Sequence, residues 1–556
     1  MREFTLKVNG KEYIKKDKVY LRDLAKELKI EAYLAKVDTR LRELDYYVNY
    51  DAEIEFLDLT HVESMNAYET TLRFLTIIAL ENLYPGVEVK FRLGVSRSTY
   101  GEIKDIMVDD ALLENLEKEM KKLIEKDQDI VRVKLSKEEA KEIYLKQGYH
   151  DKIETLKYRP EDTVNLYKCN GYYNYLFNYM LPSMGYIKDF KLIPYYPGFI
   201  ILYPRSELGG KMPEFHDSVS FAKMLRAASR WSKQLNCETI ANLNTHASND
   251  SIIDLVNVCE TKHNNMLAEL GDKIKYDIEN IRLIAIAGPS SSGKTTFSNR
   301  LRGVLMAKGI EPLKISMDDY YKPRGKAPLD ENGELDLEHI EALDIDRFNR
   351  DLLNLIQGKK VTLPHFDFNK GYSVDGKTIK ISKSTPIIIE GIHALNERLT
   401  SLIPRHQKFK IYISPLFEIS YDNHTPISAT EIRQLRRVVR DAKYRGTNVR
   451  DTFKMWPSVR KGEFRWIYPY QEEADYVFNT ELTYELGVMK KYALPVLNEV
   501  PREDEYFIDA NRLVKFLKLV KDIPDEYVPC NSLLREFIGG SIFYSYERKE
   551  QEDLLS

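Results

Sequence analysis

The sequence predicts a multidomain protein, with α+β modules in its N-terminal half and an α/β domain with a mostly parallel sheet in its C-terminal half. The 556 residues exceed what one hydrophobic core usually holds, so we expect about three or four domains. From about residue 276 onward, apolar strands alternate with helical patterns, which is typical of a parallel sheet covered on both faces. Short strands around a helix in the first 60 residues favour a small α+β module there.

The composition indicates globular cores and no strong overall charge. Hydrophobic residues make up 43% and aromatic residues 11% of the sequence, which argues against global disorder, and the net charge is −3. A nucleic-acid-binding role would therefore need a local basic patch. No apolar run reaches the ~18 residues of a membrane span. The four cysteines form no CxxC pair, which is typical of reduced thiols. We expect a cytoplasmic protein without a membrane partner.

Residues 1–60 open with a hairpin pattern, in which alternating apolar residues flank the turn Asn9-Gly10. A helical stretch at Leu21–Leu28 and further short strands follow. This order of elements resembles the TGS domain at the N-terminus of threonyl-tRNA synthetases, which implies a β-grasp module. The resemblance implies a binding or docking unit, so we assign no catalytic residue to it.

Residues 61–205 resemble the second additional (editing) domain of threonyl-tRNA synthetases, especially at Val164–Cys169 and Pro182–Leu192. The editing site of that family uses H-x-x-x-H and C-x-x-x-H as metal-type ligands. The matching positions here are Thr70, Phe74, Cys169 and Tyr173. Three of the four ligands are missing, so we expect an editing-type domain without its editing site. Contact with RNA and sensing of a ligand are the roles left open for it.

Residues 206–275 form a mainly helical segment that we expect to connect the front modules to the C-terminal domain. The helical patterns cover Ser218–Leu235, Ser251–Val258 and Thr261–Tyr276. Cys259 and His263 lie four residues apart and could share one helix face. Because a metal site needs more ligands than two, a buried thiol and an ordinary histidine are the favoured interpretation.

The sequence around Gly288 has the spacing G-x-x-x-x-G-K-[ST], after an apolar run and before a helical pattern. That context is typical of a P-loop, whose backbone N–H groups and helix N-terminus bind phosphate. Lys294 is expected to reach the β- and γ-phosphates, and the Thr295 hydroxyl to bind Mg²⁺. The predicted phosphate-binding residues are Gly288, Ser290, Ser291, Ser292, Gly293, Lys294, Thr295 and Thr296. We therefore expect ATP and Mg²⁺ as cofactors; the alternative is a glycine-rich turn that matches by chance.

Two acidic residues follow candidate strands of the 276–556 domain, where parallel sheets bind their ligands. The strands are expected at Leu283–Ala287, Pro312–Ser316, Pro386–Ile389, Phe409–Ile413 and Asp475–Phe478. Asp318 follows the second strand and is placed to orient a hydroxyl and accept its proton; the alternative is a surface turn. Glu390 follows the strand at Pro386–Ile389, the Walker-B position, where it can bind Mg²⁺.

A helical stretch from Ile432 to Arg445 is dense in arginine. Its arginines at 433, 436, 437 and 440 repeat at three and four residues, which places them on one face. Guanidinium groups suit phosphate, so the pattern predicts a lid that closes over the transferred phosphoryl group. A solvated basic face and an RNA-binding helix are the alternatives.

These motifs together resemble the uridine kinase/phosphoribulokinase family. The matching stretches are Gly288–Thr295, Ser316–Tyr321, Ile389–His393 and Leu435–Asp441. The resemblance implies Asp318 as catalytic base, Lys294, Arg437 and Arg440 in phosphoryl transfer, Thr295 and Glu390 on Mg²⁺, and Arg436 on the nucleotide. It also implies that the nucleoside contacts Tyr321, Glu338, His339, Phe366 and Asp367. The order of modules, and the C-terminal stretch Leu533–Ser541, are similar to those of bacterial nucleoside (uridine) kinases with synthetase-like N-termini.

The chain departs from this family where the base should bind. Pyrimidine nucleoside kinases carry a tyrosine and a histidine there, and Phe366 and Gly371 stand at the matching positions. Losing two polar contacts puts base preference in doubt, because discrimination falls steeply without such groups. The favoured hypothesis is an ATP- and Mg²⁺-dependent kinase of the 5′-hydroxyl of a ribonucleoside, uridine or cytidine first, in a chain that could form a homo-oligomer. The alternatives are a kinase of another small alcohol and an NTP-regulated RNA-binding protein.

Overall fold

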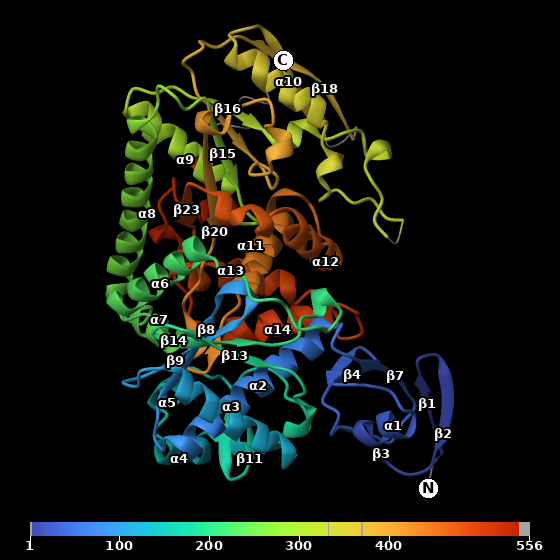
Figure 1. The fold of residues 1–556 in the computed structure, drawn as a ribbon. Helices are drawn as coiled ribbons and strands as arrows, with labels where there is room; N and C mark the ends of the chain where they lie inside the picture. Colours follow the sequence, from blue (N-terminus) through green and yellow to red (C-terminus); the bar gives the residue numbers. More distant parts are fainter. Residues whose placement is uncertain (1–2, 332, 368–370, 544–556) are drawn as a thin grey trace.

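The computed structural model describes residues 3–331, 333–367 and 371–543. Its N-terminal unit is a five-stranded sheet in the order β2-β1-β7-β4-β5, beside helix α1 (Leu21–Glu27) (Figure 1). The strands are β1 (Phe4–Val8), β2 (Lys11–Lys15), β4 (Leu34–Val37), β5 (Arg40–Arg42) and β7 (Ala52–Leu57). The short pair β3 (Val19–Tyr20) and β6 (Tyr47–Val48) lies apart from this sheet. The predicted hairpin is confirmed, since β1 and β2 pair in antiparallel fashion around Asn9 and Gly10, both with positive φ. The likeness of this unit to a TGS domain stays a prediction.

The second part is built around a long buried helix, α2 (Val62–Leu83). A four-stranded sheet, in the order β13-β14-β9-β8, and helix α3 (Asp110–Glu125) share its hydrophobic core. Those strands are β8 (Val89–Leu93), β9 (Thr99–Ile103), β13 (Lys191–Tyr195) and β14 (Gly198–Leu202). A smaller sheet joins β10 (Val131–Ser136), β11 (Thr163–Cys169) and β12 (Tyr172–Asn174), with α4 (Lys137–Gln147) and α5 (His150–Lys157) beside it. Thr70, Phe74 and Cys169 are all buried in this part.

The segment predicted as a connector forms helices α6 (Val219–Gln234), α7 (Ile240–His246) and α8 (Ser251–Tyr276). The prediction of two helices within 251–276 is wrong, because α8 is continuous. Cys259, Glu260 and His263 are all buried, so packing against the core stabilises the helix across the predicted break. Burial raises the pKa of the Cys259 thiol and lowers that of His263. Figure 1 shows α8 running along one side of the molecule, from the level of α9 to that of α7. Its apolar face belongs to the same core as the C-terminal sheet.

The C-terminal half contains the predicted parallel sheet, in the order β16-β19-β15-β20-β23. All five predicted strands are present, as β15 (Leu283–Ala287), β16 (Leu313–Ser316), β19 (Ile387–Glu390), β20 (Lys408–Ser414) and β23 (Tyr476–Asn479). Ile284 and Ile286 of β15 pack with α8 and with α9 (Lys294–Ala307), whereas Leu283 and Ala285 pack with α10 (Ile345–Ile356). Both faces are therefore covered, which explains why the strands are apolar without alternation.

The remaining elements surround this sheet. They are the hairpins β17 (Val361–Asp367)/β18 (Tyr372–Ile379) and β21 (Ser420–Asp422)/β22 (Thr425–Pro426), and helices α11 (Ala429–Tyr444), α12 (Val449–Trp466), α13 (Glu485–Leu497), α14 (Phe507–Lys518) and α15 (Arg535–Ile538). The β21–β22 hairpin docks on the second part of the chain, where the Phe91 N–H donates to the Asn423 carbonyl at 2.8 Å and Lys152 pairs with Asp422 at 2.7 Å. Within the described ranges, no helix is long and apolar enough to cross a membrane.

Candidate active site

The glycine-rich turn between β15 and α9 has the backbone geometry of a phosphate cradle. Ser291 and Gly293 both have positive φ, 60° and 90°. A Cβ on Gly288 would stand 2.3 Å from the Ile413 carbonyl oxygen of the neighbouring strand, so only glycine fits there. The hydroxyls of Ser291 and Ser292 are buried with no hydrogen-bond partner among the residues that the structure describes. Such orphaned donors fit an anion bound in the turn.

Lys294 opens α9 and folds back over the turn. Its Nζ donates to the carbonyl oxygens of Gly288 at 2.9 Å and Pro289 at 3.1 Å. Burial lowers the pKa of Lys294, and the nearby carboxylates of Glu390 and Asp318 oppose that shift. The ammonium group is thus held at the edge of the sheet where a phosphate would sit.

Thr295 and Glu390 form the predicted pair of oxygen ligands. The Thr295 hydroxyl donates to Glu390 Oε1 at 3.2 Å, which brings the P-loop helix and the end of β19 together. Burial raises the pKa of Glu390, and the charge of Asp318 raises it further, while Lys314 and Lys294 lower it. Mg²⁺ prefers hard oxygen donors such as a hydroxyl and a carboxylate. Thr295 and Glu390 supply these, and the carboxylate of Asp318 lies close by, so these residues fit the ion.

The two aspartates after β16 have separate roles. Ser316 of β16 lies beside Glu390 of β19, so the short 3₁₀ helix Met317–Tyr320 begins at the same edge as the P-loop. Asp319 turns to the β17–β18 hairpin, where its Oδ1 accepts from the Phe366 N–H at 3.1 Å and lies 3.2 Å from His365 Nδ1. Asp318 is left exposed at the site, close enough to Glu390 and Lys294 to influence the pKa of both.

Tyr321 lies between two other residues predicted to contact the acceptor, since its ring meets Phe366 and Glu338 is close enough to influence its pKa. The Tyr321 hydroxyl donates to the Leu337 carbonyl at 3.1 Å, and its ring meets Phe366 edge-on with centroids 6.0 Å apart. Burial raises the pKa of Glu338 to about 7, although Arg437 and Lys294 lower it. Glu338 is thus within electrostatic range of the P-loop lysine. Contact between these side chains and a nucleoside stays a prediction.

His339 is committed elsewhere in the structure. Its Nδ1 accepts from the Glu341 N–H at 3.0 Å, so it caps the 3₁₀ turn Ile340–Ala342, and its ring packs against Trp466 at 4.7 Å. The ribose contact that the resemblance implies for His339 stays a prediction. Asp367 ends β17, and Gly371, with φ 74°, precedes β18. The turn between them, residues 368–370, lies outside the described residues.

Two of the four arginines of the predicted lid helix are buried. Arg433 is 2% and Arg436 0% exposed, and each is bound to a buried carboxylate. Arg433 pairs with Glu463 and Arg436 with Glu485, the latter with Nε to Oε1 at 3.0 Å. Because Arg433 and Arg436 are buried in ion pairs, these two do not form a solvated basic face, while the lid and the RNA-binding helix stay predictions. The guanidinium of Arg436 is held by Glu485 and the Thr480 carbonyl, and its assignment to the nucleotide stays a prediction.

Arg437 and Arg440 remain on the site side of α11. Arg437 Nη1 donates to the Ser290 hydroxyl of the P-loop at 2.9 Å. Arg440 Nη2 donates to Asp441 Oδ1 at 2.7 Å and is near enough to Lys294 to lower its pKa. Arg433 and Arg436 also reach the P-loop, since they donate to the carbonyls of Ser290 at 3.2 Å and Ser291 at 3.5 Å. The four arginines thus differ in that Arg433 and Arg436 are in addition held by the buried carboxylates of Glu463 and Glu485.

Glu536 is a site residue that the sequence reasoning missed. Its Oε2 accepts from the Thr296 N–H at 3.0 Å, one of the amides expected to bind phosphate. The surrounding segment is firmly built, because Leu533, Leu534 and Phe537 are buried in the main core and Leu533 packs against Gly293. The stretch Leu533–Ser541 was visible as a family feature, but no local pattern places a carboxylate 240 residues away on the P-loop.

Replacing Glu536 by Gln is expected to tighten ATP binding. An anion at a helix N-terminus is worth about 0.3–2 kcal/mol, and phosphate must displace this carboxylate to reach the amide. We expect the Kd for ATP, measured by calorimetry, to fall roughly three- to tenfold, since 1.4 kcal/mol is about tenfold. Glu526→Gln, an exposed acid on the same C-terminal segment, is the matched control. Weaker ATP binding in Glu536→Gln would contradict the competition and make Glu536 a support of the loop.

Comparisons with known proteins match the same part of the chain. Residues 283–485 match the Phosphoribulokinase / Uridine kinase family. The chain is 33% identical over 199 residues to the uridine kinase of Borrelia duttonii (strain Ly), covering 35% of this chain and 85% of that protein. It is 30% identical over 200 residues to the uridine kinase of Staphylococcus haemolyticus (strain JCSC1435), covering 36% and 87%. A solved structure of a "possible uridine kinase" from Bacillus stearothermophilus aligns at a TM-score of 0.27 and 21% identity, over 38% of this chain and all of that one. Through residues 283–485, the chain belongs to the phosphoribulokinase / uridine kinase family.

Proposed function

We propose that the protein is an ATP- and Mg²⁺-dependent kinase that phosphorylates the 5′-hydroxyl of a ribonucleoside, with uridine or cytidine as the first candidates. The observation that carries the proposal is the convergence of Asp318, Lys294, Thr295, Glu390 and Arg437 at one edge of the parallel sheet. Phosphoryl transfer depends on positioning and charge stabilisation, and these residues supply both.

Each residue has a distinct part in the proposed reaction. Asp318 orients the acceptor hydroxyl and takes up its proton. Lys294 and Arg437 hold positive charge beside the P-loop, where negative charge grows on the transferred group. Thr295 and Glu390 would hold Mg²⁺, which supplies Lewis-acid stabilisation of phosphate oxygens when bound. Glu338 accepts hydrogen bonds from hydroxyls of the sugar.

The residues predicted to bind the acceptor support a second candidate function, a kinase of another small alcohol. Phe366 is 5% exposed and packs against Tyr321, so its face offers little beyond apolar contact. Gly371 contributes no side chain at the position where pyrimidine nucleoside kinases carry a histidine. A site without those polar groups discriminates weakly among bases.

A phosphoryl-transfer screen tests the proposal. Purified protein with Mg²⁺ and ATP would be offered ribonucleosides, deoxyribonucleosides and other small alcohols, and product formation measured by mass. Turnover of one or more ribonucleosides at the 5′ position is expected. Turnover of non-nucleoside alcohols alone would favour the second candidate, and no turnover despite ATP binding would overturn both.

The pKa of Glu338 predicts a pH dependence of nucleoside use. The carboxylate accepts hydrogen bonds from sugar hydroxyls more strongly than the protonated acid does, and the pKa of Glu338 is about 7. As pH rises through 7 the ionised form accumulates, so kcat/KM for the nucleoside is expected to rise up to about tenfold between pH 6 and 8. Glu338→Gln should lower kcat/KM and remove this limb of the profile. A limb near pH 7 that persists in the variant would assign it to another group.

A further inference from the structure

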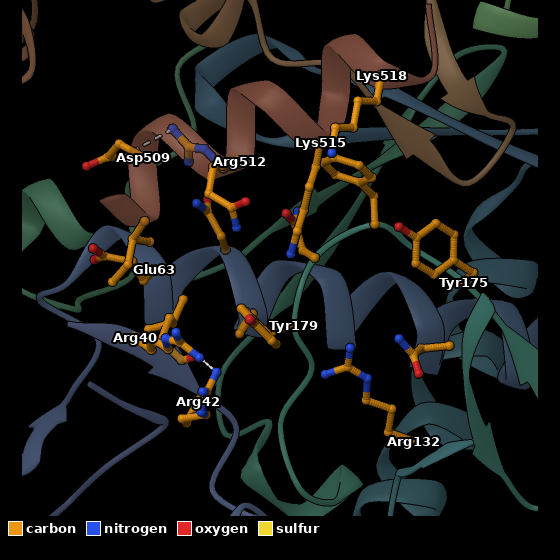
Figure 2. A pocket seen from close by; sticks show the side chains of 18 of the residues that line it. Arg40, Arg42, Glu63, Arg132, Tyr175, Tyr179, Asp509, Arg512, Lys515 and Lys518 are labelled. Atoms are coloured by element: carbon orange, nitrogen blue, oxygen red, sulfur yellow. Dashed lines mark hydrogen bonds and ion pairs between the residues drawn. The ribbon is translucent and has the colours of Figure 1, made fainter. Parts of the chain in front are cut away.

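A basic cavity of about 450 Å³ lies far from the P-loop in sequence and is bordered by three parts of the chain. Its walls come from β5 of the N-terminal unit, the β10–β12 part of the second unit, and helix α14. Figure 2 shows Arg40 and Arg42 on one side, Arg132 and Tyr175 on another, and Lys515 above them. No residue predicted from the sequence to bind substrate or cofactor lines it.

The cavity carries a marked excess of positive charge. Eight of its lining residues are basic and three are acidic, which leaves five positive charges on a chain whose net charge is −3. Two of the three acids are paired already: Glu161 lies 3.4 Å from Arg159, and Asp509 lies 3.7 Å from Arg512. Such a concentration of one sign of charge in a concave site attracts anions.

Several of the cations lack a counter-charge. Lys515, Lys518 and Arg40 make no ion pair within residues 3–331, 333–367 and 371–543. Burial lowers the pKa of Lys515, and Arg132 and Arg159 lower it further. Lys515, Arg132 and Arg159 are therefore near neighbours that repel one another, an arrangement that a bound anion would stabilise. Arg132 and Arg159 are each offset in part by one carboxylate, Glu43 and Glu161, both at 3.4 Å.

A buried donor in the wall also lacks a partner. Arg42 Nε is inaccessible to solvent and makes no hydrogen bond to any residue that the structure describes, although Arg42 Nη1 donates to the Leu41 carbonyl at 3.3 Å. Leaving a buried donor unsatisfied costs about 1–3 kcal/mol. Natural sites of this kind usually receive an acceptor from a ligand or water.

Two tyrosines place aromatic rings beside the cations. Arg159 lies over the Tyr175 ring at 5.4 Å, and Arg132 over the Tyr179 ring at 5.9 Å. Phe177, between them in sequence, has a positive φ of 66°, and its ring stacks on Tyr421 at 4.2 Å. This contact fixes the segment so that both tyrosines border the cavity (Figure 2). The site thus offers guanidinium and ammonium groups next to flat apolar faces.

We propose that this cavity binds a ribonucleotide, with its phosphates on Arg132, Arg159 and Lys515 and its base against Tyr175 and Tyr179. Guanidinium groups bind phosphate in a forked geometry, and a base stacks on an aromatic ring with about 1–3 kcal/mol. The volume is that of a small-molecule site, which typically spans about 300–1,000 Å³. An extended RNA strand would need an open groove, so we favour a mononucleotide.

The test measures binding in full-length protein that carries Lys294→Ala, so that neither turnover nor the kinase proposal affects the result. UTP, ATP, uridine, pyrophosphate and a 12-nucleotide single-stranded RNA are titrated by calorimetry without Mg²⁺. Three further variants are made in this background. Lys515→Glu and Tyr179→Leu alter the cavity, and Lys275→Glu reverses an exposed charge on α8, away from it. Because the Lys515 side chain is exposed, we expect the protein to tolerate reversal of its charge. An unchanged thermal unfolding temperature of Lys515→Glu would verify that the fold is kept.

We expect UTP or ATP to bind, Lys515→Glu to weaken that binding at least tenfold, and Lys275→Glu to leave it unchanged. Tyr179→Leu should weaken nucleotide but not pyrophosphate binding. Any binding of uridine, which lacks phosphates, should be the same in Lys515→Glu and its parent. Equal nucleotide affinity in Lys515→Glu and its parent would overturn the proposal. So would RNA binding that exceeds nucleotide binding and is lost in Lys515→Glu, because it would make the cavity part of an RNA surface.

Discussion

Replacing Asp318 by Asn is expected to lower kcat by about 10²–10⁴-fold, the usual contribution of a general base. Asn keeps the size of the side chain and can still meet the hydroxyl, but it cannot take up the proton. The affinity for ATP should stay within about twofold, because Asp318 lies beyond β16 and makes no contact with the P-loop backbone among the described residues. Single-turnover kinetics and calorimetry measure the two quantities separately.

The control for this experiment is Asp254→Asn, an exposed aspartate on α8 remote from the site. It should leave both kcat and ATP affinity unchanged. Asp319→Asn is informative for another reason, since Asp319 holds the hairpin through Phe366 and His365. It should raise KM for the acceptor more than it lowers kcat. Full activity in Asp318→Asn would remove Asp318 from the reaction.

Replacing Arg436 by Met is expected to destabilise the protein by about 3–5 kcal/mol, because it leaves the Glu485 carboxylate buried without its partner. Arg436 and Glu485 are both 0% exposed, and the guanidinium also donates to the Thr480 carbonyl at 2.9 Å. Urea-induced unfolding, followed by tryptophan fluorescence, measures the loss. Replacing both partners together, as Arg436→Met with Glu485→Leu, should recover much of it.

Arg437→Met is the matched comparison on the same helix. Arg437 lies one position further along and contacts the Ser290 hydroxyl, so its loss should lower kcat about 10²–10³-fold. Its loss should cost less unfolding free energy than that of Arg436, because its buried partner Asp441 keeps Arg440 at 2.7 Å. If Arg436→Met were stable and only ATP affinity fell, the sequence-based assignment of Arg436 to the nucleotide would be supported. The pair of variants thus separates the arginines that hold α11 from those that serve the site.

The P-loop and the five strands of the sheet could be predicted because their signals are local. The spacing of Gly288, Gly293 and Lys294 encodes a turn and a helix N-terminus, and an apolar run of four or five residues encodes a strand buried on both faces. Asp318 and Glu390 followed from the rule that ligands lie beyond the carboxyl ends of parallel strands. Each inference needed only neighbouring residues and one general property of such sheets.

The contacts of Arg436, His339 and Glu536 could be known only from the tertiary structure. The spacing of the four arginines gives no reason to distinguish Arg436 from Arg437. The two differ because Arg436 pairs with Glu485, which lies 49 residues away in the sequence. Glu536 reaches the Thr296 amide from 240 residues away, and the basic cavity is assembled from three distant segments. Charge pairing and burial depend on which distant segments come into contact, and local sequence patterns do not show those contacts.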